Sequence, residues 1–168
     1  MQSERIEANR RAYERLLKDD NYADVRFNPT NGALSAIHKD HFFDPTIGRF
    51  GVPRGDYERI STEILYKYGY SIILCSEKYG YKVKNPEGYL NGKLFDIKSV
   101  EGTGKNNVIN NFKGASKKGV ESIVLYYHDK SVFSEKQLRE GYQFYLRNSQ
   151  SKQIQFVYYI MNNKLHTL

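Results

Sequence analysis

A glutamate, an aspartate and a lysine lie close together in the middle of the chain, around a predicted hairpin. Glu87 precedes the dipeptide Asn91-Gly92, a strong two-residue hairpin signal because both central positions of that turn need a positive φ. Asp96 and Lys98 follow the turn two residues apart on one strand, so their side chains point to the same face. We expect the hairpin to bring Glu87 beside Asp96, which places two carboxylates and one ammonium on a rigid sheet.

This trio has the composition of a metal-dependent hydrolytic site. Two carboxylates held close together repel each other, and a divalent cation relieves the repulsion. Such oxygen ligands suit Mg²⁺, with Mn²⁺ or Zn²⁺ as alternatives, and the cation would stabilise charge on a phosphodiester under attack. A lysine two residues further lies about 6–7 Å along the strand. From there it can orient the attacking water or neutralise the phosphate. The alternative is an ordinary solvated strand face.

The spacing of these residues resembles a known family signature. Pro86-Glu87, eight further residues and then Asp96-Ile97-Lys98 resemble the motif of the PD-(D/E)XK nuclease superfamily. The closer likeness is to the C-terminal nuclease domains of contact-dependent growth-inhibition toxins and related polymorphic, phage-related toxins. The chain departs from the motif at Glu87, where an aspartate is usual; the charge is kept and the side chain is one methylene longer.

A further acidic residue lies on a predicted helix over residues 56–68. Glu58 stands at the flank of the apolar face of this helix. The helix resembles the one that precedes the core of the toxin nucleases, whose glutamate joins the active site. The resemblance therefore implies that Glu58, Glu87 and Asp96 hold the metal and that Lys98 acts beside them. An exposed helical glutamate is the alternative for Glu58.

Two histidines stand in the segment of residues 32–43. His38 and His41 are three residues apart, a spacing that can ligate a metal, but the sequence shows no third well-placed donor beside them. Their role is left open. The single cysteine, Cys75, lies in an apolar run and is interpreted as a small buried residue rather than a nucleophile.

Basic and amide side chains follow the hairpin. Residues 101–105 form a glycine-rich turn before a predicted helix over residues 106–118, and a helix N-terminus is a natural phosphate contact. Candidates to bind the backbone of a nucleic acid are Lys105, Asn110, Lys113 and Lys117. A solvated lysine face is the alternative for each.

Composition favours a polyanionic partner. The chain has 168 residues, a net charge of +7 and a pI of about 9.3, which favours nucleic acid first and an anionic membrane surface second. No apolar run approaches the roughly 18 residues of a membrane span, so none is expected. Fifteen tyrosines and nine phenylalanines supply bulk for a core that is otherwise moderately apolar.

The element order predicts an α/β fold. Further helices are expected over residues 3–18 and from Ser134 onward, and further strands over residues 71–75, 79–83, 122–128 and 154–161. Alternating strands and helices after a hairpin predict a mixed central β-sheet with helices on both faces, as in the PD-(D/E)XK core. We divide the chain into an N-terminal helix and linker (residues 1–28) and a nuclease domain (residues 29–168).

These features predict a metal-dependent endonuclease that hydrolyses phosphodiester bonds in DNA or tRNA, with DNA favoured. The resemblance further implies a toxin module with a cognate immunity protein, acting in the cytoplasm of a target cell. Two alternatives remain: a non-catalytic nucleic-acid-binding module, and a phage structural or morphogenesis segment.

Overall fold

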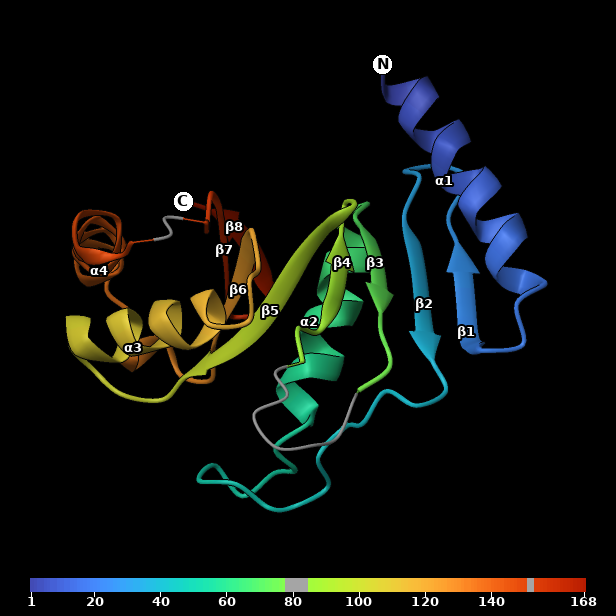
Figure 1. The fold of residues 1–168 in the computed structure, drawn as a ribbon. Helices are drawn as coiled ribbons and strands as arrows, with labels where there is room; N and C mark the ends of the chain where they lie inside the picture. Colours follow the sequence, from blue (N-terminus) through green and yellow to red (C-terminus); the bar gives the residue numbers. More distant parts are fainter. Residues whose placement is uncertain (78–84, 151–152) are drawn as a thin grey trace.

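The computed structural model describes residues 1–77, 85–150 and 153–168. Its helices are α1 (Gln2–Leu17), α2 (Asp56–Lys67), α3 (Lys105–Ser116) and α4 (Glu135–Asn148), with a short 3-10 helix at Lys130–Val132 (Figure 1). Its strands are β1 (Tyr22–Phe27), β2 (Leu34–His38), β3 (Ser71–Leu74), β4 (Gly88–Leu90), β5 (Lys93–Val100), β6 (Ser122–Tyr127), β7 (Phe156–Met161) and β8 (Lys164–Thr167).

The strands of the described residues form one eight-stranded sheet whose order in space follows their order in the chain. The pairs β2–β3, β5–β6 and β6–β7 are parallel, and the remaining pairs are antiparallel. A parallel pair needs a long crossover. Helices α2, α3 and α4 supply these crossovers, which explains why helix and strand alternate in this part of the sequence.

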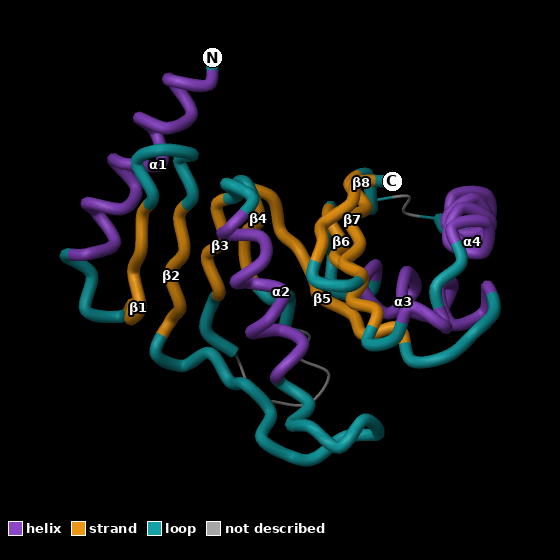
Figure 2. Tube along the Cα trace, turned by 180° about the vertical axis from the view of Figure 1, so that it is seen from behind, coloured by secondary structure: helices purple, strands orange, loops and turns teal. Residues whose placement is uncertain are grey.

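The helices lie on both faces of the sheet. Ile72 and Leu74 of β3 pack into the core under α2, whereas Ile73 between them packs toward the small core under α1. The same alternation in β5 sends Phe95 to the core of α2 and Val100 to the core of α3 and α4. Helix α2 therefore covers one face, and α1, α3 and α4 cover the other (Figure 2). The predicted mixed α/β sheet with helices on both faces is confirmed.

The predicted hairpin is present at the centre of the sheet. Asn91 and Gly92 both have positive φ, and β4 pairs with β5 in the register Gly88↔Phe95. Gly88 is required here because a Cβ at this position would lie 1.9 Å from the carbonyl oxygen of Ile73. The close approach of β3 to β4 thus depends on the glycine that directly follows Glu87.

Three strands were not foreseen. β1 is irregular, with a register shift between Ala23 and Arg26 and a positive φ at Asp24. β2 and β8 are the other two. As a result, the segment expected to be an N-terminal helix and linker carries an edge strand of the common sheet. The strand predicted over residues 79–83 lies outside the described residues.

Candidate active site

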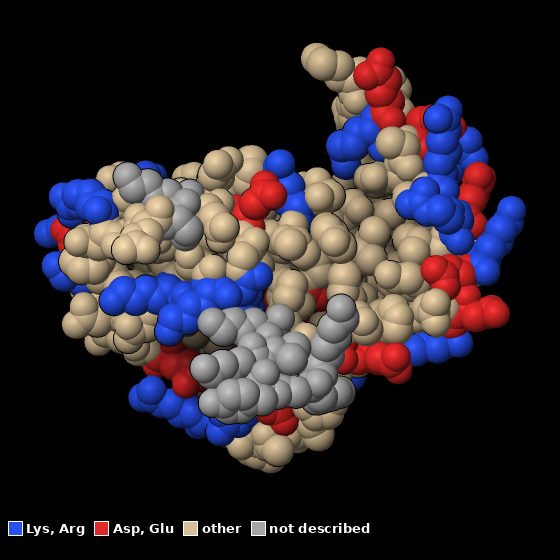
Figure 3. Space-filling model, in the orientation of Figure 1, with Lys and Arg blue, Asp and Glu red and all other residues tan. Residues whose placement is uncertain are grey.

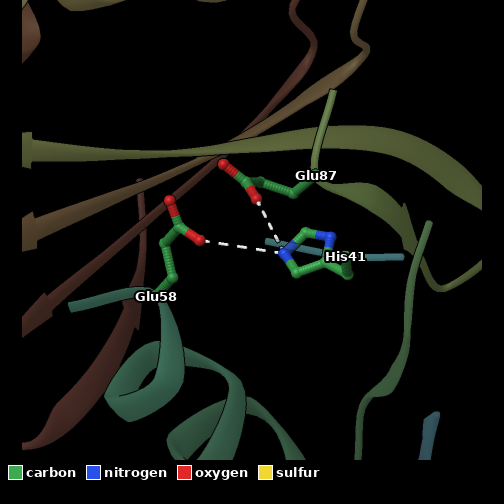
Figure 4. Close-up of side chains that lie close together, drawn as sticks. All are labelled: His41, Glu58 and Glu87. Atoms are coloured by element: carbon green, nitrogen blue, oxygen red, sulfur yellow. Dashed lines mark ion pairs between the residues drawn. The ribbon is translucent and has the colours of Figure 1, made fainter. Parts of the chain in front are cut away.

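Three elements distant in the sequence bring acidic and imidazole side chains to one place. Extending the β4–β5 register by one residue places Glu87 opposite Asp96, and the backbone N–H of Glu87 donates to the carbonyl of Phe95 at 3.0 Å. The first turn of α2 supplies Glu58, and the loop after β2 supplies His41. Figure 4 shows Glu58 and Glu87 pointing toward His41 from two sides.

His41 presents one ring nitrogen to both glutamates. Its Nδ1 lies 2.7 Å from the carbonyl oxygen of Cys75, which can only accept, so Nδ1 carries a proton. The imidazole Nε2 lies 3.8 Å from an Oε2 of Glu58 and 3.6 Å from an Oε2 of Glu87. These separations are too long for hydrogen bonds. Within the described part of the chain, buried Nε2 of His41 and Oε2 of Glu58 both lack a hydrogen-bond partner.

The electrostatics of this cluster favour a positive charge at its centre. Burial lowers the pKa of His41, but the neighbouring Glu58 carboxylate and the Cys75 carbonyl outweigh this, and the net pKa is raised. Burial, followed by the charges of Glu58 and Asp96, raises the pKa of Glu87 well above its ordinary value. Glu87 therefore resists ionisation unless a cation compensates its charge.

Asp96 is held by two lysines. Its carboxylate is fully buried; Lys98 Nζ lies 3.1 Å from Oδ2, and Lys118 Nζ donates to Oδ1 at 3.0 Å. Lys118 comes from the turn after α3. Burial opposes its charge, yet Asp96 outweighs burial and raises the pKa of Lys118. Asp96 is thus electrostatically paired within the protein, whereas Glu58 and Glu87 face His41.

A pocket of about 350 Å³ opens beside the cluster. Glu58 and Lys98 line it together with Tyr57 of α2, and the loop between β2 and α2 contributes Arg49 and Arg54. Its remaining lining residues are Asp44, Gly48, Phe50, Val52, Pro53, Ser99, Glu101, Asn111 and His128. Glu58 of the acidic cluster therefore borders a pocket that carries three cationic side chains.

The structure brings four sequence-predicted residues into one region. Glu58 and Glu87 share His41, and the charge of Asp96 raises the pKa of Glu87, which places these carboxylates within electrostatic reach. Lys98, predicted from the spacing to share a strand face with Asp96, forms an ion pair with it. Among the described residues, the group whose donor atoms lie within 4.8 Å of one another is His41, Glu58 and Glu87.

The predicted backbone-binding residues lie apart from the pocket. Lys105, Asn110, Lys113 and Lys117 are exposed on or beside α3. Lys113 and Lys117 border a separate cavity of about 390 Å³ between α3 and α4, and Asn111 of α3 reaches the pocket. Figure 3 shows Lys and Arg side chains forming a band across the surface where α3 lies.

The two histidines have different surroundings. His38 Nδ1 accepts a hydrogen bond from the backbone N–H of Asp40 at 3.0 Å, and its ring packs edge-on against Tyr22. Only His41 of the pair faces the carboxylates. Sequence reasoning left it open because its partners come from α2 and from the residue that precedes β4. Lys118 was missed, since no sequence signal joins the end of α3 to Asp96.

The comparisons with known proteins give one match. Residues 84–165 match the sequence model of the contact-dependent growth inhibition CdiA C-terminal domain. The match begins just before Glu87 and includes Asp96, Lys98 and Lys118, and it supports the resemblance to the toxin domains of this system. Comparison with curated proteins and with solved structures finds no match. Among the described residues, no helix is long and apolar enough to cross a membrane.

Proposed function

We propose that the protein is a metal-dependent endonuclease that hydrolyses phosphodiester bonds of nucleic acid and serves as a toxin module. The observation that carries this proposal is the buried cluster in which His41 Nε2 and Glu58 Oε2 face Glu87 without hydrogen-bond partners. The adjacent Asp96–Lys98 pair, the net charge of +7 and the match to a growth-inhibition domain support it.

The donor set fits a divalent cation. Ligand atoms about 2.0–2.2 Å from a common ion lie at most about 4.4 Å apart. The separations of Nε2 of His41 from Glu87 and Glu58, 3.6 and 3.8 Å, fall within that limit, and all three donor atoms lie within 4.8 Å of one another. A ligating histidine usually donates its other ring N–H to a carbonyl or carboxylate, as Nδ1 of His41 does. One imidazole with two carboxylates favours Mn²⁺ or Zn²⁺ over Mg²⁺.

His41, Glu58 and Glu87 would hold this cation, which would supply an activated water and positive charge for the phosphate. The predicted ligand Asp96 has another role in this proposal. It fixes Lys98, whose ammonium lies on the pocket wall and can donate to a phosphate oxygen or to the attacking water. Lys118 balances the second oxygen of Asp96, which leaves Lys98 free to share its protons with the substrate.

The surface charge supplies affinity for the nucleic-acid backbone. Arg49 and Arg54 at the pocket are placed to bind phosphates next to the cleaved one. The exposed lysines of α3, Lys113 and Lys117, would extend this contact without sequence preference. DNA remains the favoured substrate over tRNA. We further propose that a cognate immunity protein with an acidic surface neutralises the toxin in its producer.

Cleavage of plasmid DNA and of tRNA, with chelator and then with added Mg²⁺, Mn²⁺ or Zn²⁺, tests the proposal. We expect metal-dependent cleavage that Asp96→Ala, Lys98→Ala and Glu58→Gln abolish. Glu63→Gln is the matched control, because Glu63 lies on α2 but pairs with Arg26 on the surface. Full cleavage in chelator, or by the Lys98→Ala variant, would overturn the assignment. Salt-sensitive binding without turnover would indicate the non-catalytic binding module instead.

A further inference from the structure

The pocket beside the acidic cluster contains a column of aromatic rings. The Phe50 ring stacks on the His128 ring with centroids 4.3 Å apart and an interplanar angle of 18°. His128 in turn packs edge-on against Tyr126 and Tyr57, at 4.8 and 6.2 Å. The column ends at Phe50, which lines the pocket and remains 39% exposed, with the Arg49 guanidinium lying over its ring.

We propose that this pocket binds one unpaired nucleobase of the substrate, stacked on Phe50, beside the phosphodiester that is cleaved. The inference rests on the proposed nuclease function, and it deepens it by naming the structural class of the substrate: a single-stranded or looped segment. Nothing in the acidic cluster itself requires the substrate to be unpaired.

The shape and size of the pocket suit one nucleotide. Its volume of about 350 Å³ lies near the lower end of the range of about 300–1,000 Å³ for small-ligand sites. Every base has a π-face that stacks on an aromatic side chain, and such stacking is sequence-tolerant. A paired base inside a duplex covers both of its faces and its pairing edge, so it enters such a pocket only after leaving the stack.

The chemistry around Phe50 also matches a nucleotide. Arg49 has its guanidinium 5.9 Å from the centre of the Phe50 ring and, with Arg54, provides positive charge for a phosphate next to the base. Asn111 and Glu101 provide hydrogen-bonding groups for base edges. Burial lowers the pKa of His128, so the ring beneath Phe50 is neutral at pH 7 and adds no cation within the stack.

The position of the pocket ties the base to the site of cleavage. Glu58 and Lys98 line the same pocket as Phe50, so a nucleotide stacked on Phe50 would share the pocket with both side chains. The stack therefore acts on substrate placement, and we regard Phe50 as a positioning residue.

Binding of a short oligonucleotide that carries one 2-aminopurine tests the inference. Fluorescence of this base is quenched on stacking, and the titrations use chelator so that the oligonucleotide stays intact. Single-stranded DNA, single-stranded RNA and duplex DNA of one sequence are compared. The variants are Phe50→Ala, Phe50→Leu and Phe50→Trp. Phe42→Ala is the control, because Phe42 belongs to the same loop, is 48% exposed and lies outside the pocket.

We expect single strands to bind more tightly than the duplex. Phe50→Ala should weaken binding by roughly 5- to 150-fold, the loss of one base–aromatic stack, and should remove the quenching. Phe50→Leu, which keeps apolar bulk without a π-face, should lose affinity as well, whereas Phe50→Trp and Phe42→Ala should bind as the unmodified protein does. The DNA and RNA arms show which sugar the pocket accepts.

Equal binding by Phe50→Ala and the unmodified protein would overturn the inference. An equal loss in Phe42→Ala, or tighter binding of the duplex, would also overturn it. A different experiment tests the proposed function: if the unmodified protein cleaves nothing with any metal, the nuclease proposal is wrong. The titrations alone decide whether a base binds to Phe50.

Discussion

Replacing Glu87 by glutamine should change how the stability of the protein depends on pH. Glu87 is only 7% exposed, and its folded-state pKa is raised above the ordinary value of 4.5 by burial and by the charges of Glu58 and Asp96. Below pH 4.5 the carboxyl is protonated in both the folded and the unfolded chain. Its contribution to stability is therefore fully present there and is lost as the pH rises through the folded-state pKa.

The size of this effect follows from proton linkage. Between pH 4.5 and the raised pKa, the unfolded chain has released the proton and the folded chain has kept it. Each pH unit in that window lowers the free energy of unfolding by about 1.4 kcal/mol relative to Glu87→Gln, which cannot ionise. For a domain of this size that equals a drop in Tm of about 3–6 °C per pH unit. Above the raised pKa the difference becomes constant.

Urea unfolding followed by far-ultraviolet circular dichroism, in chelator and over several pH values, measures the difference. Glu63→Gln is the control, because it makes the same chemical change at an exposed position and should keep the pH dependence of the unmodified protein. The pKa of His41 is also raised, so His41 too lowers the free energy of unfolding as the pH rises above 6.5. This contribution is common to the unmodified protein and the variants, so it cancels when their stability curves are compared. Parallel stability curves for the unmodified protein and Glu87→Gln would refute the electrostatic reasoning.

Four further outcomes follow from the same geometry. Mn²⁺ at about 100 times its dissociation constant should raise the free energy of unfolding of the unmodified protein by about 2.7 kcal/mol, which corresponds to a rise in Tm of about 5–11 °C. Differential scanning calorimetry measures this rise, which should be smaller in the His41→Ala variant. Lys98→Ala should lower kcat about 10²–10³-fold and should also lower stability, because the buried Asp96 carboxylate loses one of its two cations, as initial-rate kinetics and a thermal melt would show. Lys118→Met should destabilise the protein by about 1.5–3 kcal/mol in chemical denaturation, because Asp96 loses a charged hydrogen-bond donor. Lys113→Ala should weaken nucleic-acid binding uniformly across sequences and lower the slope of log affinity against log salt by about one, as filter binding at several salt concentrations would show.

The sequence predicted the parts of the site that lie on one short segment. Asn91-Gly92 determines the hairpin, the hairpin register places Glu87 opposite Asp96, and the two-residue period of a strand puts Lys98 on the same face as Asp96. All three inferences use local geometry with a fixed period, so they need no knowledge of tertiary packing.

The parts that were missed depend on contacts between distant segments. His41 meets Glu58 and Glu87 only because the loop after β2 packs against α2 and the sheet, and the carbonyl of Cys75 orients its ring. Lys118 meets Asp96 because α3 crosses back over β5. Strand β1 also escaped prediction; it contains a bulge between Ala23 and Arg26, where the strand pairing shifts.

Anomalous X-ray scattering from a crystal soaked in Mn²⁺ tests most directly whether His41, Glu58 and Glu87 share a divalent cation. We predict an anomalous peak between the imidazole Nε2 and the two carboxylates, with Asp96 still bound to its lysines. A crystal that binds Mn²⁺ elsewhere, or that shows no peak at this cluster at saturating metal, would contradict the account.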